Sequence, residues 1–313
     1  MKMSVIYFFK VGKIQWERIL FMQLFMQQLV NGISLGSIYA LIALGYTMVY
    51  GTIRLINFAH GDIYMMGAFI GYFLVSIWNI NIFVAMLLAG LVCAILGVVI
   101  ERVAYKPLRK STRVAALITA IGVSYFLQNI MVYFFGPEVR AFPSTFPVMP
   151  FRLFGIVINM KQVLVFVTTI VLMIVLNGIV RYTKMGKAMR AVAVDAEAAQ
   201  LMGIDVNRVI SFTFALGSAL AGVAGVLVGV YYNSISATMG TTPGLKAFVA
   251  AVVGGVGSIP GAMIGGYLIG LLETIVTFMG GSMYKDAAVY ALLIVILLVR
   301  PSGIFGKNVK EKV

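Results

Sequence analysis

The chain has 313 residues, of which 61% are hydrophobic and 11% are charged, and its mean hydropathy is +1.02. Soluble domains carry about 25% charged residues, so this composition excludes a soluble globular enzyme, a disordered chain and a coiled coil. The chain has 24 Lys and Arg residues against 10 Asp and Glu residues, which gives a net charge of +14. These basic residues lie in short loops beside apolar runs, so they indicate a membrane protein rather than one that binds nucleic acid.

The first segment, residues 1–19, is interrupted by four charged residues after position 9 and has no small-residue cleavage site behind it. We therefore expect an amphipathic or disordered lead-in rather than a cleaved signal peptide. The single cysteine, Cys93, and the single histidine, His60, exclude an intrachain disulfide and multi-histidine metal sites.

Apolar runs follow along the rest of the chain, and each is read against the roughly 20 residues that one membrane crossing needs. They cover residues 20–50, 63–78, 82–100, 114–135, 162–180, 209–232, 247–279 and 286–300. We expect an all-α polytopic integral membrane protein with about eight transmembrane helices plus a broken or re-entrant segment. Residues 20–306 would form a single transmembrane domain, and 307–313 a cytoplasmic tail.

The loops predict the orientation of these spans. Loops 101–113 and 181–208 each contain five Lys or Arg residues and the stretch 300–313 contains four, so all three should be cytoplasmic. Loop 136–160 has two bases and four prolines, and we expect it outside together with 79–81 and 233–246. The N-terminus is ambiguous, because its own basic residues favour the inside whereas the number of crossings favours the outside.

The break is expected inside the run 247–279, where the sequence reads GGVGSIPG from Gly254 to Gly261. Glycine and proline at this density interrupt a helix, and such backbone is tolerated at membrane depth only inside protein or beside a cavity. We expect a half-helix near 247–255, a turn and a helix near 261–279, with Gly254, Gly255 and Gly257 as candidate residues of a path. Small residues elsewhere, such as Gly217, Gly222 and Gly225, indicate close helix packing.

Two further segments are candidates for function. Loop 181–208 is rich in helix formers over 187–201, so we expect one or two short helices, with Asp195 capping the second and Gly203 ending it. The polar residues Asn57, His60 and Asp62 lie between two apolar spans, and they should face protein or water rather than lipid. They fit either a capped helix end, with Asp62 leading a helix that begins at 63, or a broken helix that lines a permeation path.

Glu197-Ala198-Ala199, followed by three residues and Gly203, resembles the cytoplasmic EAA loop of ABC importer permeases. Longer stretches are similar to the LivH-type permease family of branched-chain amino-acid ABC importers, namely GSIYALIALGYTMVYGTIRLINFAHGD (36–62), ERVAYKPLR (101–109), MGKAMRAVAVDAEAAQLMGI (185–204), KAFVAAVVGGVGSIPGAMIGG (246–266) and RPSGIFG (300–306). The likeness begins near residue 22.

This resemblance implies a type II ABC importer-like fold in a prokaryotic inner membrane and a coupling helix that docks on an ATPase. It implies a homologous second permease, two ATPase subunits that hold ATP and Mg²⁺, and a periplasmic or lipid-anchored solute-binding protein. The docking candidates are Asp195, Glu197, Ala198, Ala199, Gly203 and Ile204. No Walker A sequence occurs, so we expect no ATP hydrolysis and no cofactor on this chain.

Alternatives remain at this stage. Related permeases handle urea, short amides or other amino acids instead of leucine, isoleucine and valine. A secondary transporter driven by protons or sodium would need intramembrane acids, and Asp62 with His60 is the best pair for it. A membrane-embedded enzyme or a purely structural subunit is the third possibility, although no nucleophile, base and metal ligands are evident together.

Overall fold

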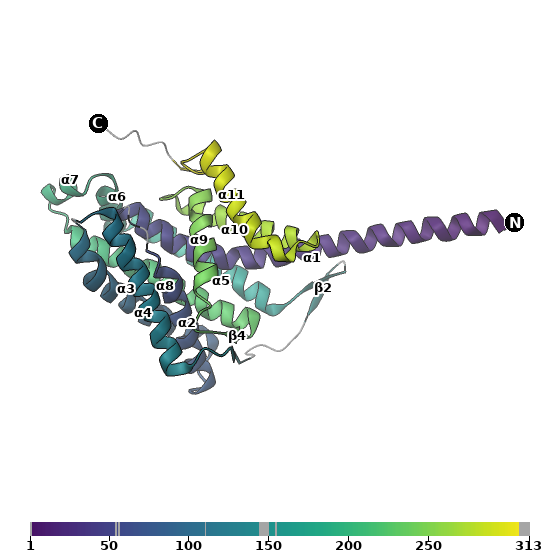
Figure 1. The fold of residues 1–313 in the computed structure, drawn as a ribbon, viewed down its shortest axis with the longest axis horizontal. Coiled ribbons are helices and arrows are strands. Elements are labelled where there is room, and N and C mark those ends of the chain that lie inside the picture. Colours follow the sequence, from purple (N-terminus) through teal and green to yellow (C-terminus); the bar gives the residue numbers. More distant parts are fainter. Residues whose placement is uncertain are drawn as a thin grey trace.

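A computed structural model describes residues 2–53, 55, 57–109, 111–143, 150–153 and 155–306. The described residues form a helical bundle, shown in Figure 1, from which the N-terminal part of α1 projects. The helices are α1 (Lys2–Ile53), α2 (His60–Ser76), α3 (Ile82–Ile100), α4 (Arg113–Phe135), α5 (Met160–Tyr182), α6 (Lys184–Val194), α7 (Ala196–Leu201), α8 (Val206–Tyr232), α9 (Thr241–Gly254), α10 (Ile259–Phe278) and α11 (Lys285–Val299).

Seven helices of the described chain are long and apolar enough to cross a membrane: Phe21–Ile53, Ile82–Leu108, Val114–Phe135, Met160–Tyr182, Val206–Tyr232, Ile259–Phe278 and Ser282–Val299. The 17-residue α2 and the 14-residue α9 are shorter. These elements reproduce the expected all-α polytopic class, including the broken segment, since α9 and α10 are separate helices on either side of the glycine-rich turn.

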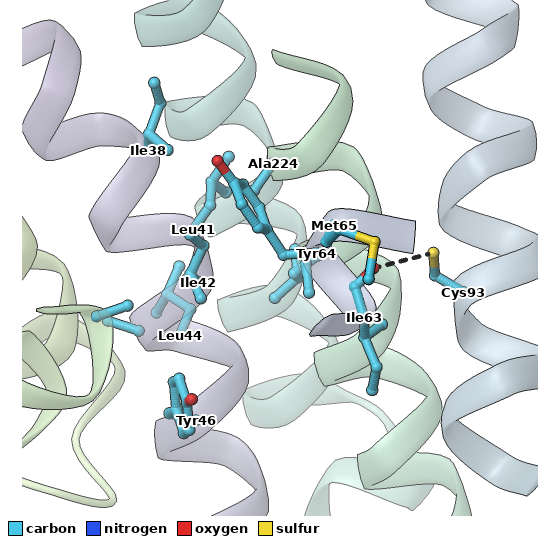
Figure 2. Packing of buried hydrophobic residues seen from close by; sticks show 14 of the residues in the cluster. Ile38, Leu41, Ile42, Leu44, Tyr46, Ile63, Tyr64, Met65, Cys93 and Ala224 are labelled. Carbon is cyan, nitrogen blue, oxygen red and sulfur yellow. Dashed lines mark hydrogen bonds between the residues drawn. The ribbon is translucent and has the colours of Figure 1, made fainter. Parts of the chain in front are cut away.

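The core lies where α1, α2, α3 and α8 meet. Figure 2 shows Leu41 of α1, Tyr64 of α2 and Ala224 of α8 packed together, and all three are buried. The thiol of Cys93 on α3 lies 3.6 Å from the carbonyl oxygen of Ile63. Because lipid offers little hydrophobic gain to a buried helix, such contacts rely on close van der Waals packing.

Glycines allow this close packing at the positions that their spacing predicted. Gly222 of α8 lies against Gly67 of α2 and against Cys93, and a Cβ atom on it would be 2.8 Å from the Cys93 sulfur. Gly225 lies against the backbone of Tyr64 in the same way. A larger side chain would force α8 away from α3 at Gly222 and away from α2 at Gly225.

The basic loops gather at one end of the bundle. Arg109, in the loop after α3, donates to the Oδ1 atom of Asn207 at 2.7 Å. The carboxylate of Glu101 accepts from Arg109 and from the hydroxyl of Ser211, near the N-terminal end of α8. The positive-inside rule predicts that this is the cytoplasmic end. The C-terminal end of α1 belongs to it too, because Gly51 packs against Gly257.

The opposite end carries the loop between α4 and α5. Gln27 of α1 exchanges hydrogen bonds with Val157, at 2.8 and 2.9 Å, and Asn31 accepts from Gln162 at 2.9 Å. Since α1 runs unbroken between the two ends, its N-terminal part lies at the end opposite the basic loops. The number of crossings therefore predicts an N-terminus outside, whereas the basic residues before position 20 predict one inside, and the side of the N-terminus stays a prediction.

Small β pairs cover the outer end. Strand β1 (Arg140–Ala141) pairs antiparallel with β4 (Ser234–Ile235), and β2 (Phe151–Leu153) pairs with β3 (Ile156–Ile158). These strand pairs hold parts of the outer loop 136–160, whose four prolines predicted a loop at this place.

Four expectations need correction or qualification. Residues 2–19 are helical and continue into α1, so the lead-in is not disordered. The segment 101–113 begins as a continuation of α3, with a π-helical turn (Glu101–Tyr105) and a 3-10 turn (Lys106–Leu108). The outer segment 233–246 is shorter than expected, because α9 already begins at Thr241. The predicted tail 307–313 lies outside the described residues.

Candidate functional site: a cytoplasmic helix and a cavity inside the bundle

The cytoplasmic loop 181–208 forms the two short helices that its composition predicted, α6 and α7. Asp195 begins α7, and its Oδ1 atom accepts from the backbone nitrogens of Glu197 at 3.0 Å and Ala198 at 2.9 Å. These bonds satisfy two of the amide groups that a helix start leaves open. Asp195 is therefore the cap that the sequence indicated.

The end of α7 is equally well defined. Gly203 has a φ of +84°, and its amide bonds the carbonyl of Gln200 while the amide of Ile204 bonds that of Ala199. This pair of bonds is a Schellman motif, which favours glycine in the left-handed position. Asp205 then caps α8 directly, accepting from the Arg208 amide at 3.1 Å. Only four residues, 202–205, therefore separate α7 from α8.

Large apolar side chains are exposed at both ends of α7. The side chains of Leu201 and Met202 are 90% and 83% exposed, and Val194 just before α7 is also exposed. Ala199 is buried on the inward side, Ile204 is half-buried, and Glu197, Ala198 and Gly203 are exposed. Large apolar side chains at the tip of a cytoplasmic loop are typical of a surface that another protein covers.

The polar residues of the 56–62 segment lie inside the bundle, and all three are buried. Asn57 accepts from the hydroxyl of Tyr105 at 2.9 Å. The ring of His60 lies 4.6 Å from that of Tyr46, measured between centroids, and it bonds the backbone of Ile42. The Nε2 atom of His60 has no hydrogen-bond partner among the described residues.

Asp62 differs from the expected helix cap. The helix α2 begins at His60, and Ala59 precedes it without a side-chain cap. Asp62 lies in the first turn, and its Oδ1 atom accepts from Nε2 of Gln128 on α4 at 2.8 Å. Asp62 lies beyond the cap position, and its carboxylate bonds α4 instead of capping its own helix.

A cavity of about 370 Å³ adjoins this carboxylate, and we call it the Asp62 cavity. Its lining comes from α1, α2, α4 and α9 and from the segments next to them: Tyr46, Phe58, Asp62, Ile121, Ser124, Tyr125, Gln128, Gly240, Thr241, Gly244 and Leu245. Its volume falls within the range of about 300–1,000 Å³ that is usual for small-molecule sites.

Two discontinuous helices start at this cavity. Gly244 of α9 packs on Gly61 of α2, where a Cβ atom on Gly244 would be 2.9 Å from the Gly61 Cα atom. The chain reaches α9 from the outer end through a short turn after β4, residues 236–240. Broken helices that begin inside a membrane protein, beside a cavity, are typical of transporter binding sites.

The three candidate glycines of the break lie elsewhere. Gly254 and Gly255 are buried at the cytoplasmic end, where the C-terminal segment packs on them: the amides of Ile304 and Phe305 bond the carbonyls of Val253 and Gly254 at 2.9 and 3.0 Å. Gly255 and Gly257 have positive φ angles of 107° and 87°. None of the three lines the Asp62 cavity.

Comparison with known proteins gives this geometry its context. Residues 28–298 match the model of the family described as branched-chain amino acid transport system, permease component. The chain belongs to this permease family.

Individual members resemble it over most of their length. It is 46% identical to the high-affinity branched-chain amino acid transport system permease protein LivH of Escherichia coli over 92% of this chain and 98% of that protein. It is 44% identical to the corresponding BraD of Pseudomonas aeruginosa over the same shares, and 32% identical to a probable LivH of Methanocaldococcus jannaschii over 90% and 93%.

Membership of a transport family and seven candidate spans identify a multi-pass membrane protein and a transport subunit rather than an enzyme. In this permease, the described residues contain no group of three or more His, Cys, Asp or Glu side chains placed to hold a metal.

Sequence reasoning missed a cluster of charged side chains in the permease that has Lys246 and Glu273 buried at its centre. Lys246 of α9 lies 2.5 Å from Glu273 of α10 and 2.6 Å from Asp286 at the start of α11, and the hydroxyl of Tyr39 lies 3.2 Å from both Glu273 oxygens. The sequence does contain a signal for this cluster, because one lysine and two acids occur in three successive apolar helices and such charges are expected to pair.

Proposed function

We propose that this permease is the membrane subunit of an ABC importer and forms the transmembrane path for leucine, isoleucine and valine in a prokaryotic inner membrane. The observation that carries the solute class is the likeness, over nearly the whole length of both chains, to permeases whose names state branched-chain amino acid transport. Residues 20–306 act as one permease domain.

The energy enters from outside the chain in this proposal. Two ATPase subunits hold ATP and Mg²⁺ and dock on α7 through Asp195, Glu197, Ala198, Ala199, Gly203 and Ile204. The exposed Leu201 and Met202 support this role, because an unpaired apolar tip at the cytoplasmic end favours a protein partner. The rigid link from α7 to α8 supports transmission of the partner's movement into the bundle.

The solute arrives from a periplasmic or lipid-anchored binding protein and passes beside the broken helices. Asn57, His60 and Asp62 line the path within the bundle. Gly254, Gly255 and Gly257 border its cytoplasmic end, beside a small gap lined by Asn57 and Val256. A homologous second permease completes the path from the other side.

A matched pair of surface variants tests the docking surface. Leu201→Lys places a charge on the tip of α7, whereas Met283→Lys places the same charge on a side chain that is 92% exposed at the opposite end. We expect Leu201→Lys, like Glu197→Lys and Gly203→Pro, to abolish co-purification of the ATPase subunits and leucine uptake, and Met283→Lys to preserve both. Unchanged association and uptake in all the α7 variants would refute the docking role.

A further inference from the structure

The Asp62 cavity contains a buried carboxylate without a cation. The Asp62 residue is only 2% exposed, yet its carboxylate faces a space large enough for a small solute. Gln128 donates to it, and the hydroxyl of Ser124 also bonds it. Among the described residues, no Lys, Arg or His side chain lies within ion-pair distance of it.

The Asp62 carboxylate has hydrogen-bond donors around it but lacks the cation that a buried carboxylate needs. Two neutral hydrogen-bond donors and the first turn of α2 offset part of the desolvation of a carboxylate, but buried carboxylates are ordinarily paired with a cation. The other buried acids follow that rule: Glu101 pairs with Arg109, and Glu273 pairs with Lys246. Asp62 is the exception, and it is the buried acid that borders the cavity.

The remaining walls of the cavity specify the rest of the ligand. Most of the large side chains in the lining are aliphatic or aromatic and come from α4, from α9 and from the segment before α2, namely Ile121, Tyr125, Leu245 and Phe58. They suit a short branched hydrocarbon rather than a sugar or a bare ion, since a polyol would leave its hydroxyl groups unpaired against them.

We propose that the Asp62 cavity is a recognition site for the α-ammonium group of the transported amino acid, with Asp62 as its counter-charge and Gln128 and Ser124 as the side chains that orient the carboxylate. This inference rests on the proposed function and deepens it. The solute replaces the missing cation while it is in the site, and its apolar side chain lies against Phe58, Ile121 and Leu245.

The test uses the assembled permease–ATPase complex without the binding protein, so that the selectivity of that protein does not mask the site. Binding of radiolabelled leucine at millimolar concentration is measured against two competitors. One is 3-methylbutylamine, which keeps the ammonium group and lacks the carboxylate, and the other is 4-methylpentanoate, which keeps the carboxylate and lacks the ammonium group. We expect the amine to compete and the acid not to.

Three variants separate charge from structure. Asp62→Asn keeps the shape and is expected to weaken leucine binding by about ten- to hundredfold, the value of a charge-assisted hydrogen bond. Asp62→Glu keeps the charge and should retain binding and competition by the amine. Glu138→Gln, which neutralises an exposed acid of the outer loop, is the matched control and should change nothing.

Several results overturn the inference. They are unchanged binding in Asp62→Asn, competition by 4-methylpentanoate alone, absence of leucine binding to the unaltered complex, or binding that follows Na⁺ concentration and ignores the amine. If the Asp62→Asn variant fails to assemble, competition by the amine and by the acid on the unaltered complex still tests whether the site recognises the ammonium group. Failure of the proposed function is distinguishable, because it would appear as loss of ATP-driven leucine uptake by the complete, unaltered importer.

Discussion

The buried cluster of Lys246, Glu273, Asp286 and Tyr39 permits the most quantitative prediction. Replacing Lys246 by Met removes the cation from two carboxylates at once. Glu273 is 3% exposed and would retain only the hydroxyl of Tyr39 as a partner, whereas the side chain of Asp286 is 45% exposed and regains water. The cost therefore falls mainly on Glu273.

Breaking a buried ion pair by removing one partner costs about 3–5 kcal/mol, because the remaining charge is left uncompensated. We expect Lys246→Met to lower the stability of the purified permease by about this amount. The double variant Lys246→Met/Glu273→Gln removes the stranded charge as well. It should recover more than half of the loss, since replacing both members of a buried pair is often nearly neutral.

Thermal unfolding of the detergent-solubilised complex measures this double-mutant cycle. Lys285→Met is the matched control, because it removes an exposed lysine next to Asp286, and it should shift the midpoint little. If the single and double variants were equally unstable, the stranded-charge reasoning would be wrong, and the loss would instead reflect packing of the lysine stem.

Three further predictions concern single contacts. Gly222→Val should destabilise the bundle by at least about 1–3 kcal/mol, seen as a lower unfolding midpoint, because its Cβ would already meet the Cys93 sulfur at 2.8 Å. Asp195→Ala should cost α7 about 0.5–2 kcal/mol and weaken association of the ATPase subunits in pull-down assays, with unaltered total expression. Tyr105→Phe should destabilise the fold by about 1–3 kcal/mol in the same unfolding assay, because it leaves the buried Oδ1 atom of Asn57 without its donor. An unchanged unfolding midpoint in this variant would mean that another group replaces the hydroxyl.

Local signals in the sequence predicted the cytoplasmic helix well. Asp195 and Gly203 act within a few residues of themselves, so the start and end of α7 could be read without knowledge of the fold. The break between α9 and α10 was predictable for the same reason, because Gly255 permits a positive φ that other residues avoid and Pro260 fixes its own φ.

The partners of buried polar groups could not be predicted in this way. Asp62 meets Gln128 across 66 residues, and Tyr39 meets Glu273 across 234. Such pairs depend on which helices become neighbours, and spacing along one helix carries no information about that. The start of α2 was misplaced for a related reason: Asp62 resembles a helix cap in sequence, but α2 begins at His60 and the carboxylate accepts from Gln128 of α4.

The central claim is that this permease is a conduit powered by separate ATPase subunits. Its most direct test is leucine uptake into proteoliposomes that contain either the complete importer or the two permease subunits alone, with binding protein outside and ATP within reach of the ATPase side. We expect uptake against a gradient only with the complete importer and hydrolysable ATP. Uphill leucine uptake by the permease subunits alone, driven by a proton or sodium gradient and indifferent to ATP, would contradict the account.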